Sequence, residues 1–240
     1  MSYFCTERDK TDMNKLSGVV SALVLMMLMS CAEQYSVVGN SSESILDGRM
    51  AYIKTIDNNT YQTLDSCEVL HGNFHMVGPL DSVRFVTLFM GDDSFIPFVL
   101  EEGDVHISIQ NSQIRIGGTP LNDRLFIFFT SRDSLAMLRA ELPKRESQMY
   151  LEGYSQDEIL DLLSTEQMKL NQSLDKLETK FITDNFDNVL GVTWFLELCN
   201  RAYNIFGYAT TTPQIDEIYG QAPESFRQQP AIKAFMDEAK

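Results

Sequence analysis

The sequence predicts an α+β protein, with an N-terminal antiparallel β-sandwich or barrel-like domain followed by a C-terminal helical domain. Residues 35–116 form short runs rich in Val, Ile, Phe, Tyr and Thr, which Gly, Asn, Asp and Pro interrupt about every ten residues. Beyond residue 121, apolar residues recur at three- and four-residue steps, as in helices packed on a core. Gly117, Gly118 and Pro120 separate the two textures. We therefore place the β domain at residues 35–118 and the helical domain at residues 119–240.

Strand-forming runs and turn residues alternate through the β domain. Asp57-Asn58-Asn59 closes one run, while Gly72-Asn73 and Glu102-Gly103-Asp104 each predict a hairpin turn. The last run alternates polar and apolar residues, as a half-buried strand does. The predicted strands begin at residue 35 and continue at residues 50–56, 60–70, 73–77, 83–90, 95–100, 105–109 and 113–116.

Capping patterns and prolines divide the helical domain. The first helix is predicted at residues 121–142, ending near Pro143 because proline removes a backbone donor. Ser155-Gln156-Asp157-Glu158 is a capping box that opens a long helix reaching about residue 185. Residues 188–206 form a third, more apolar helix. Thr212-Pro213 then opens a short fourth helix, and a last turn or two starts at Pro230.

The N-terminus predicts export and lipidation. Residues 16–29 are uncharged and mostly apolar, yet fewer than the roughly 20 residues that a membrane-spanning helix needs. Lys15 precedes this run, and Leu28-Met29-Ser30-Cys31 follows as a segment that resembles the lipobox of bacterial lipoproteins. The resemblance implies that residues 1–30 are a lipoprotein signal peptide and that Cys31 is lipidated, so that residues 31–34 form the lipidated N-terminus.

The first twelve residues do not suit such a leader. Glu7, Asp9 and Asp12 oppose the positive charge that a signal peptide carries before its apolar run. We therefore expect Met13 to be the natural start. The remaining thiols are then Cys67 and Cys199, which the sequence leaves either paired or free.

Charge and composition exclude one class of partner. The chain has 34 acidic and 19 basic side chains, a net charge of −15, which repels a phosphate backbone. Nucleic acid is therefore not an expected partner. The hydrophobic content of 44% is sufficient for a folded core.

Several stretches resemble a known family in combination. They are Tyr35-Ser36-Val37-Val38-Gly39, Leu64-Asp65-Ser66, His71-Gly72-Asn73-Phe74-His75-Met76-Val77-Gly78, Phe98-Val99-Leu100-Glu101-Glu102-Gly103-Asp104 and Ile116-Gly117-Gly118-Thr119-Pro120-Leu121-Asn122-Asp123. They resemble a domain of unknown function that follows the lipidated cysteine in exported lipoproteins of Gram-negative anaerobes, often before a TlpA-like thioredoxin domain. The helical part resembles the connector of those proteins through Phe181-Ile182, Asn185, Asp187-Asn188, Leu190-Gly191 and Thr212-Pro213.

The resemblance implies a location but no reaction. It points to the cell envelope, with an outer-membrane lipoprotein that faces the periplasm or the cell surface. The sequence contains no Cys-x-x-Cys, so the redox activity of the longer relatives does not carry over.

The candidate sites are few. His71, His75 and His106 lack neighbouring ligands at metal-binding spacing, and the acidic turns at residues 91–94 and 101–104 depart from an EF-hand pattern. We therefore expect no metal, no cofactor and no catalytic residue. Asp81-Ser82-Val83 and Asp133-Ser134-Leu135 resemble acceptors for O-glycosylation in exported proteins of such anaerobes, which makes Ser82 and Ser134 candidate sites.

The sequence thus predicts a non-catalytic binding or interaction module of the envelope. Its expected partners are the membrane, through Cys31, and an envelope protein. An accessory to a periplasmic TlpA-like thiol–disulfide system is the alternative. A carbohydrate-binding protein is a third hypothesis, which would need exposed aromatic platforms, while Trp194 is predicted to lie inside a helix core.

Overall fold

The computed structural model describes residues 33–239 apart from residues 58–59, 91–93 and 112. The predicted signal peptide, its start at Met13 and the lipidated Cys31 therefore lie outside the described residues. So does most of the acidic turn at residues 91–94.

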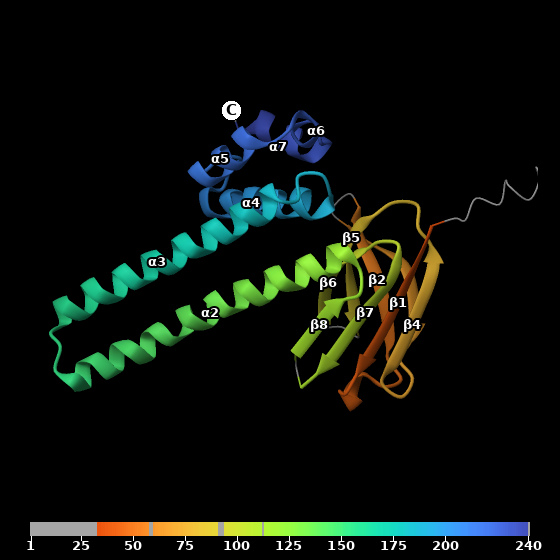
Figure 1. Cartoon of the computed structure of the whole chain (residues 1–240), viewed down its shortest axis with the longest axis horizontal. Helices are drawn as coiled ribbons and strands as arrows, with labels where there is room; N and C mark the ends of the chain where they lie inside the picture. The colour runs from red at the N-terminus through yellow and green to blue at the C-terminus, as the bar shows by residue number, and fades with distance from the viewer. Residues whose placement is uncertain (1–32, 58–59, 91–93, 112, 240) are drawn as a thin grey trace, which may run out of the picture. The chain divides into compact units, whose positions relative to one another are not determined.

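In the described part of the chain, eight strands form two four-stranded sheets (Figure 1). One sheet has the strand order β4-β1-β7-β8 and the other the order β3-β2-β5-β6. The sheets pack as a sandwich that is not closed into a barrel, and the helices follow it, so the predicted α+β class is confirmed. The strands are β1 (Gln34–Ser41), β2 (Met50–Asp57), β3 (Thr60–Glu68), β4 (Asn73–Pro79), β5 (Arg84–Met90), β6 (Ser94–Leu100), β7 (Gly103–Gln110) and β8 (Gln113–Gly117), with a short 3-10 turn, η1 (Ser44–Leu46).

Two features of the strand pairing differ from the prediction. β1 and β7 run parallel, with Val37 beside Val105, whereas the other described strand pairs are antiparallel. β6 and β7 belong to different sheets, so Glu102-Gly103-Asp104 carries the chain between sheets and is not a hairpin turn. Both differences arise because the alternation of side chains identifies a strand but not its neighbour.

The turn predicted at Gly72-Asn73 is confirmed. Leu70 and Asn73 exchange two backbone hydrogen bonds, N–H to O, of 2.9 and 3.0 Å. His71 and Gly72 lie between them with φ of 52° and 73°, the left-handed backbone that a two-residue turn requires.

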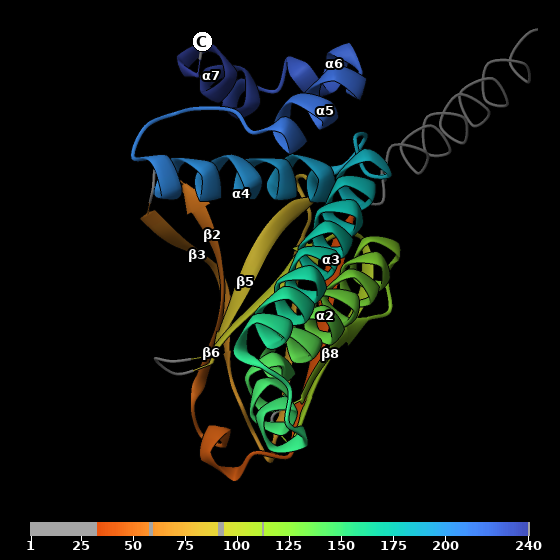
Figure 2. The same cartoon turned by 90° about the vertical axis from the view of Figure 1, so that its left-hand side faces the viewer.

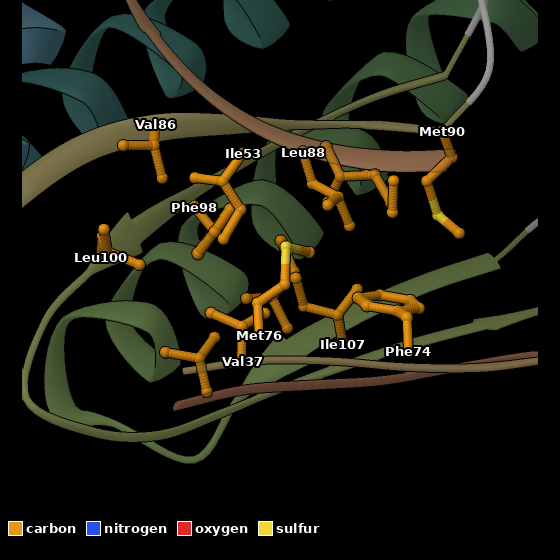
Figure 3. Close-up of a cluster of buried hydrophobic side chains, with 14 of the residues drawn as sticks. Val37, Ile53, Phe74, Met76, Val86, Leu88, Met90, Phe98, Leu100 and Ile107 are labelled. Atoms are coloured by element: carbon orange, nitrogen blue, oxygen red, sulfur yellow. The ribbon is translucent and has the colours of Figure 1, made fainter. Parts of the chain in front are cut away.

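The core of the sandwich comes from alternate residues of both sheets (Figure 3). Ile53 and Leu88 from one sheet face Val37 and Ile107 from the other, and all four are at most 1% exposed. A strand presents every second side chain to one face, so the alternating pattern of the sequence builds this layer directly.

Two aromatic–glycine pairs join β1 to β4. Tyr35 lies opposite Gly78, and Phe74 lies opposite Gly39. A Cβ atom on Gly39 would come within 1.8 Å of the Phe74 ring, and one on Gly78 within 2.5 Å of the Tyr35 hydroxyl. Each glycine therefore makes room for the ring across from it.

Two helices begin at their predicted caps, Ser155 and Thr212, and Asn188 caps a third. Ser155 and Glu158 form the capping box, and Asn188 and Thr212 each accept a hydrogen bond from a backbone N–H of the helix that follows. The helices are α2 (Pro120–Glu152), α3 (Gln156–Thr183), α4 (Val189–Phe206), α5 (Pro213–Gln221), α6 (Glu224–Arg227) and α7 (Pro230–Glu238). Figures 1 and 2 show α2 and α3 side by side as a long hairpin.

The predicted end of the first helix near Pro143 is wrong, because α2 continues to Glu152. Pro143 is exposed, so water can hydrate the backbone carbonyl that loses its partner. The helix beyond it packs along α3, where Leu142 is buried and Arg145 forms an ion pair with Glu166. Packing between the two helices thus compensates the cost of the proline.

The sandwich and the helices share buried residues. Val99, on the outer face of β6, belongs to the helical core, and Phe85 of β5 packs against that core. Residues 34–240 form one compact unit. β8 ends at Gly117 and α2 begins at Pro120, on either side of the predicted domain boundary.

Within the described part of the chain, no helix has the length and apolar character needed to cross a membrane.

Candidate functional site

A groove of about 670 Å³ lies between α2 and the open edge of the sandwich. β6 and β8, the outermost strands of their sheets, form one wall, and α2 forms the other. The strand wall includes Ile96, Pro97 and residues 113–116; the helix wall includes Phe126, Phe129, Thr130, Asp133, Ser134 and Met137.

Asn122 positions the helix wall of this groove. Its side-chain amide mimics a neighbouring strand, because Oδ1 accepts from the Val99 N–H at 2.8 Å and Nδ2 donates to the Val99 carbonyl at 2.7 Å. Asn122 is fully buried, and Nδ2 also donates to Thr119 Oγ1 at 2.8 Å. The first turn of α2 is therefore hydrogen-bonded to the edge of β6.

Glu101 fastens the same turn from the other side. One carboxylate oxygen accepts from the backbone N–H groups of Leu121 and Asn122 at 2.9 and 3.1 Å. These N–H groups are at the N-terminus of α2, where a negative charge is favourable. Further along, the Arg115 guanidinium lies over the Phe126 ring at 5.5 Å and joins β8 to the helix.

The two edge strands of the groove differ in their free hydrogen-bonding groups. On β6, Pro97 has no backbone N–H, and Asn122 already pairs with Val99. In the part of the chain that the structure describes, β8 pairs only with β7, and Gln113, Ile114 and Arg115 are exposed. The edge of β6 is thus blocked while the edge of β8 is left for another strand.

The groove offers binding contacts along an apolar lining. Ile96, Phe126 and Met137 give it an apolar lining. The hydroxyls of Thr130 and Ser134 donate to backbone carbonyls one helical turn earlier, at 2.9 and 2.8 Å. Both hydroxyl protons are therefore directed to the backbone of α2.

The two candidate glycosylation sites lie on different elements. Ser82 is exposed between β4 and β5, and its Oγ accepts from Arg84 Nε at 2.9 Å. Ser134 is exposed in the middle of α2 and lines the groove. Both hydroxyls are at the surface, and their modification stays a prediction.

The two described thiols are free and poorly suited to redox chemistry. Cys67 is partly buried on β3, and Cys199 is buried in α4. Burial raises the pKa of the Cys67 thiol and raises that of Cys199 to about 12. A thiol that attacks disulfides needs a lowered pKa, because the thiolate is the nucleophile.

The three histidines lie in the β domain, and the single tryptophan lies in the helical core. Ser36 Oγ is 3.3 Å from His75 Nε2, His71 occupies a turn, and His106 packs against Gly118. No group of three or more His, Cys, Asp or Glu residues in the described ranges could hold a metal ion. Trp194 is 8% exposed, which confirms its predicted place inside the helical core.

A buried ion cluster was not predicted from the sequence. Glu178 on α3 is 1% exposed, and its carboxylate oxygens lie 2.6 Å from Arg201 Nη2 and 3.4 Å from Arg132 Nε. Arg132 also lies over the Trp194 ring at 5.0 Å. The sequence contains one sign of this cluster. Glu178 directly follows Leu177 and lies three residues before Phe181, so it interrupts the apolar stripe of this helix with an acidic side chain.

Residues 35–125 match the family described as Domain of unknown function (DUF4369). The DUF4369 match covers the eight described strands except Gln34 of β1 and ends just beyond Asn122, so it includes the hydrogen bonds that fasten α2 to β6. It agrees with the resemblance to a domain of unknown function. No curated protein and no solved structure matches the chain.

The structure gives the stretches that carry the resemblance a packing role. Gly39 and Gly78 make room for aromatic rings, and the Tyr35 hydroxyl donates to Asp65 at 2.9 Å. Asp123 Oδ1 accepts from the Gly118 N–H at 3.0 Å, and a Cβ atom on Gly117 would meet that same oxygen at 2.6 Å. These positions pack the matched region, and the groove lies beside them.

Proposed function

We propose that the protein is a lipid-anchored, non-catalytic interaction module of the cell envelope, and that it binds an extended polypeptide segment in the groove between α2 and the sandwich edge. The observation that carries the proposal is the difference between the two edge strands. Pro97 and Asn122 occupy the edge of β6, whereas β8 keeps an unpaired edge beside an apolar wall.

An extended peptide satisfies both parts of this groove. Its backbone N–H and C=O groups would pair with the free edge of β8, as in strand addition to a sheet. Alternate side chains of the peptide would then point toward Phe126, Phe129 and Met137, which line the helix wall. Backbone pairing supplies affinity, and the apolar lining selects the side chains.

Lipidation would bring this groove to a membrane surface. Residues 16–29 and Cys31 support a lipoprotein leader, and β1 begins at Gln34, three residues after Cys31. Three extended residues span only about 10 Å. The sandwich would therefore stand close to the lipid headgroups of the outer membrane, facing the periplasm or the cell surface, with another envelope protein as its partner.

The role of accessory to a TlpA-like redox system remains an alternative within this proposal. The raised thiol pKa values of Cys67 and Cys199 favour a contribution through binding over one through thiol exchange.

Site-specific cross-linking in native membranes tests the groove. A photo-cross-linking residue replaces Met137, which lines the groove and is 70% exposed, or Met168, which is 54% exposed on α3 and outside that lining. We expect position 137 to capture a defined segment of an envelope protein and position 168 not to capture it. A Cys31→Ala chain should be released from the membrane and lose this cross-link.

Binding measurements show whether the captured segment binds the groove or was only close to it when it was cross-linked. A synthetic copy of the segment should bind the purified chain and slow hydrogen exchange at the amides of residues 113–116. Met137→Glu should weaken binding about ten-fold or more, while Met168→Glu should not. Equal binding by both variants, or unchanged exchange in β8, would refute strand addition at this groove.

Modification of the native protein belongs to the same test. Its intact mass should show loss of residues 1–30 and acyl chains on Cys31, and it would reveal any glycan on Ser82 or Ser134. A glycan on Ser134 would fill the groove, because this residue lines it. Peptide binding and modification at Ser134 therefore exclude each other.

A further inference from the structure

A second pocket, of about 400 Å³, lies between α2 and α3. Phe128, Phe181, Ile127 and Leu177 form its apolar part, and Arg124 and Lys180 supply its cations. It shares no lining residue with the groove and so uses another face of α2. We propose that this pocket binds a small apolar carboxylate, such as a medium-chain fatty acid.

The apolar part of the pocket is built on packed aromatic rings. The Phe128 and Phe181 rings stack with their centroids 3.8 Å apart and their planes 5° from parallel. The Trp194 ring meets Phe128 edge-on at 4.7 Å and holds the pair from the core side. Ile127, in contrast, is 66% exposed, so a large apolar side chain lies at the surface beside this stack. An apolar ligand body would cover it.

The charge of the pocket selects an anion. Arg124 Nη1 donates to Asn185 Oδ1 at 3.3 Å, and among the described residues Arg124 forms no ion pair with a carboxylate. Asn185 is 2% exposed and is itself fixed, because its Nδ2 donates to the Phe181 carbonyl at 2.7 Å. The guanidinium is thus oriented by a buried amide and keeps other N–H donors for a ligand.

The second cation of the pocket is already neutralised. Lys180 Nζ lies 2.6 Å from Asp184 Oδ2, and both residues line the pocket. One uncompensated positive charge therefore remains, at Arg124, in a chain whose net charge is −15. A single carboxylate matches the planar fork of a guanidinium, and its one negative charge balances the one charge of Arg124, whereas a phosphate dianion would leave a second negative charge without a partner. Charge and lining together specify an apolar monoanion.

Titration of the full-length chain with decanoate tests this proposal, with decanamide as a neutral probe of the same length. Decanoate should bind saturably at one site, and Arg124→Gln should weaken it about ten-fold or more. Arg139→Gln removes another arginine of α2, outside this pocket, and should change nothing. Decanamide should bind more weakly than decanoate and be insensitive to Arg124→Gln.

Two further variants distinguish binding in this pocket from nonspecific binding and from loss of the fold. Ile127→Glu should abolish decanoate binding, whereas Leu151→Glu, at a residue 88% exposed near the end of α2, should not. Thermal unfolding confirms that each variant is folded. Decanoate binding that survives both Arg124→Gln and Ile127→Glu, or its absence from the wild-type chain, would overturn the proposal. Met137→Glu should leave decanoate binding intact, so this pocket and the groove can fail separately.

Discussion

Asn122 is the residue on which the position of α2 depends. Its amide completes the hydrogen bonding of Val99, a residue with no exposed surface on the edge strand β6. The sequence offered Asn122 only as part of the stretch that resembles a known family. Its partner lies 23 positions earlier, so no local pattern could connect the two residues.

Replacing Asn122 with Ala should destabilise the fold strongly. The change leaves the buried N–H and carbonyl of Val99 without partners, and each such group costs about 1–3 kcal/mol. We expect the free energy of unfolding in urea to fall by about 2–6 kcal/mol. Asn171→Ala, at an exposed position of α3, is the matched control and should change it by less than about 0.5 kcal/mol. Equal effects of the two changes would contradict the role given to Asn122.

At the scale of elements, the helices were more predictable than the strand pairing. The predicted caps at Ser155 and Thr212 are local signals, and the structure confirms them. The continuation of α2 past Pro143 depends on packing against α3, which a single helix does not encode. In the same way, the parallel pairing of β1 with β7 brings together segments far apart in sequence.

Glu178 joins three of these helices. It lies on α3 and forms ion pairs with Arg132 of α2 and Arg201 of α4. Glu178→Gln removes the only negative charge of this cluster and leaves two arginines facing a neutral amide. Loss of one partner from a buried ion pair costs about 3–5 kcal/mol, and because water reaches the two arginines in part, we expect a loss of about 2–3 kcal/mol.

The exposed pair of Arg145 and Glu166 provides the control for this change. It also links α2 to α3, but both side chains are substantially exposed. Glu166→Gln should therefore lower the free energy of unfolding by less than about 1 kcal/mol. Urea unfolding of both variants is the measurement. If Glu178→Gln is as mild as Glu166→Gln, the cluster does not hold the helices together.

At the scale of the whole molecule, the sandwich and the helices should unfold together. Val99 belongs to the helical core while its strand belongs to the sandwich, and Asn122 hydrogen-bonds α2 to that strand. A single transition, coincident in far-ultraviolet and tryptophan signals, is expected for such a unit.

Alkaline pH should destabilise both the sandwich, through Tyr35, and the helical core, through Cys199. Burial, and then the hydrogen bond to Asp65, raises the pKa of Tyr35 from 10.0 to about 12, and burial raises that of Cys199 from 9.0 to about 12. The folded chain then binds more protons than the unfolded chain above pH 9, so stability falls as pH rises toward 12. Below pH 9 this contribution is fully present.

Urea unfolding between pH 8 and pH 11.5 measures this dependence. Tyr35→Phe should lower stability at pH 8, because the hydrogen bond to Asp65 is lost, and should flatten the decline above pH 10. A constant free energy of unfolding across that range would show that these groups do not keep their protons in the fold.

The sequence by itself determined the fold class, the order of most elements and the helix caps at Ser155 and Thr212. It also shows that the chain contains no Cys-x-x-Cys motif. Each of these depends on composition or on neighbouring residues. The sequence also carries the basis for expecting lipidation at Cys31. Only the tertiary structure decided which strands are neighbours, that α2 passes Pro143, and where the groove and the pocket at Arg124 lie. Those features join residues distant in sequence, such as Val99 with Asn122 and Phe128 with Phe181. Their contacts depend on packing in three dimensions, which local periodicity does not specify.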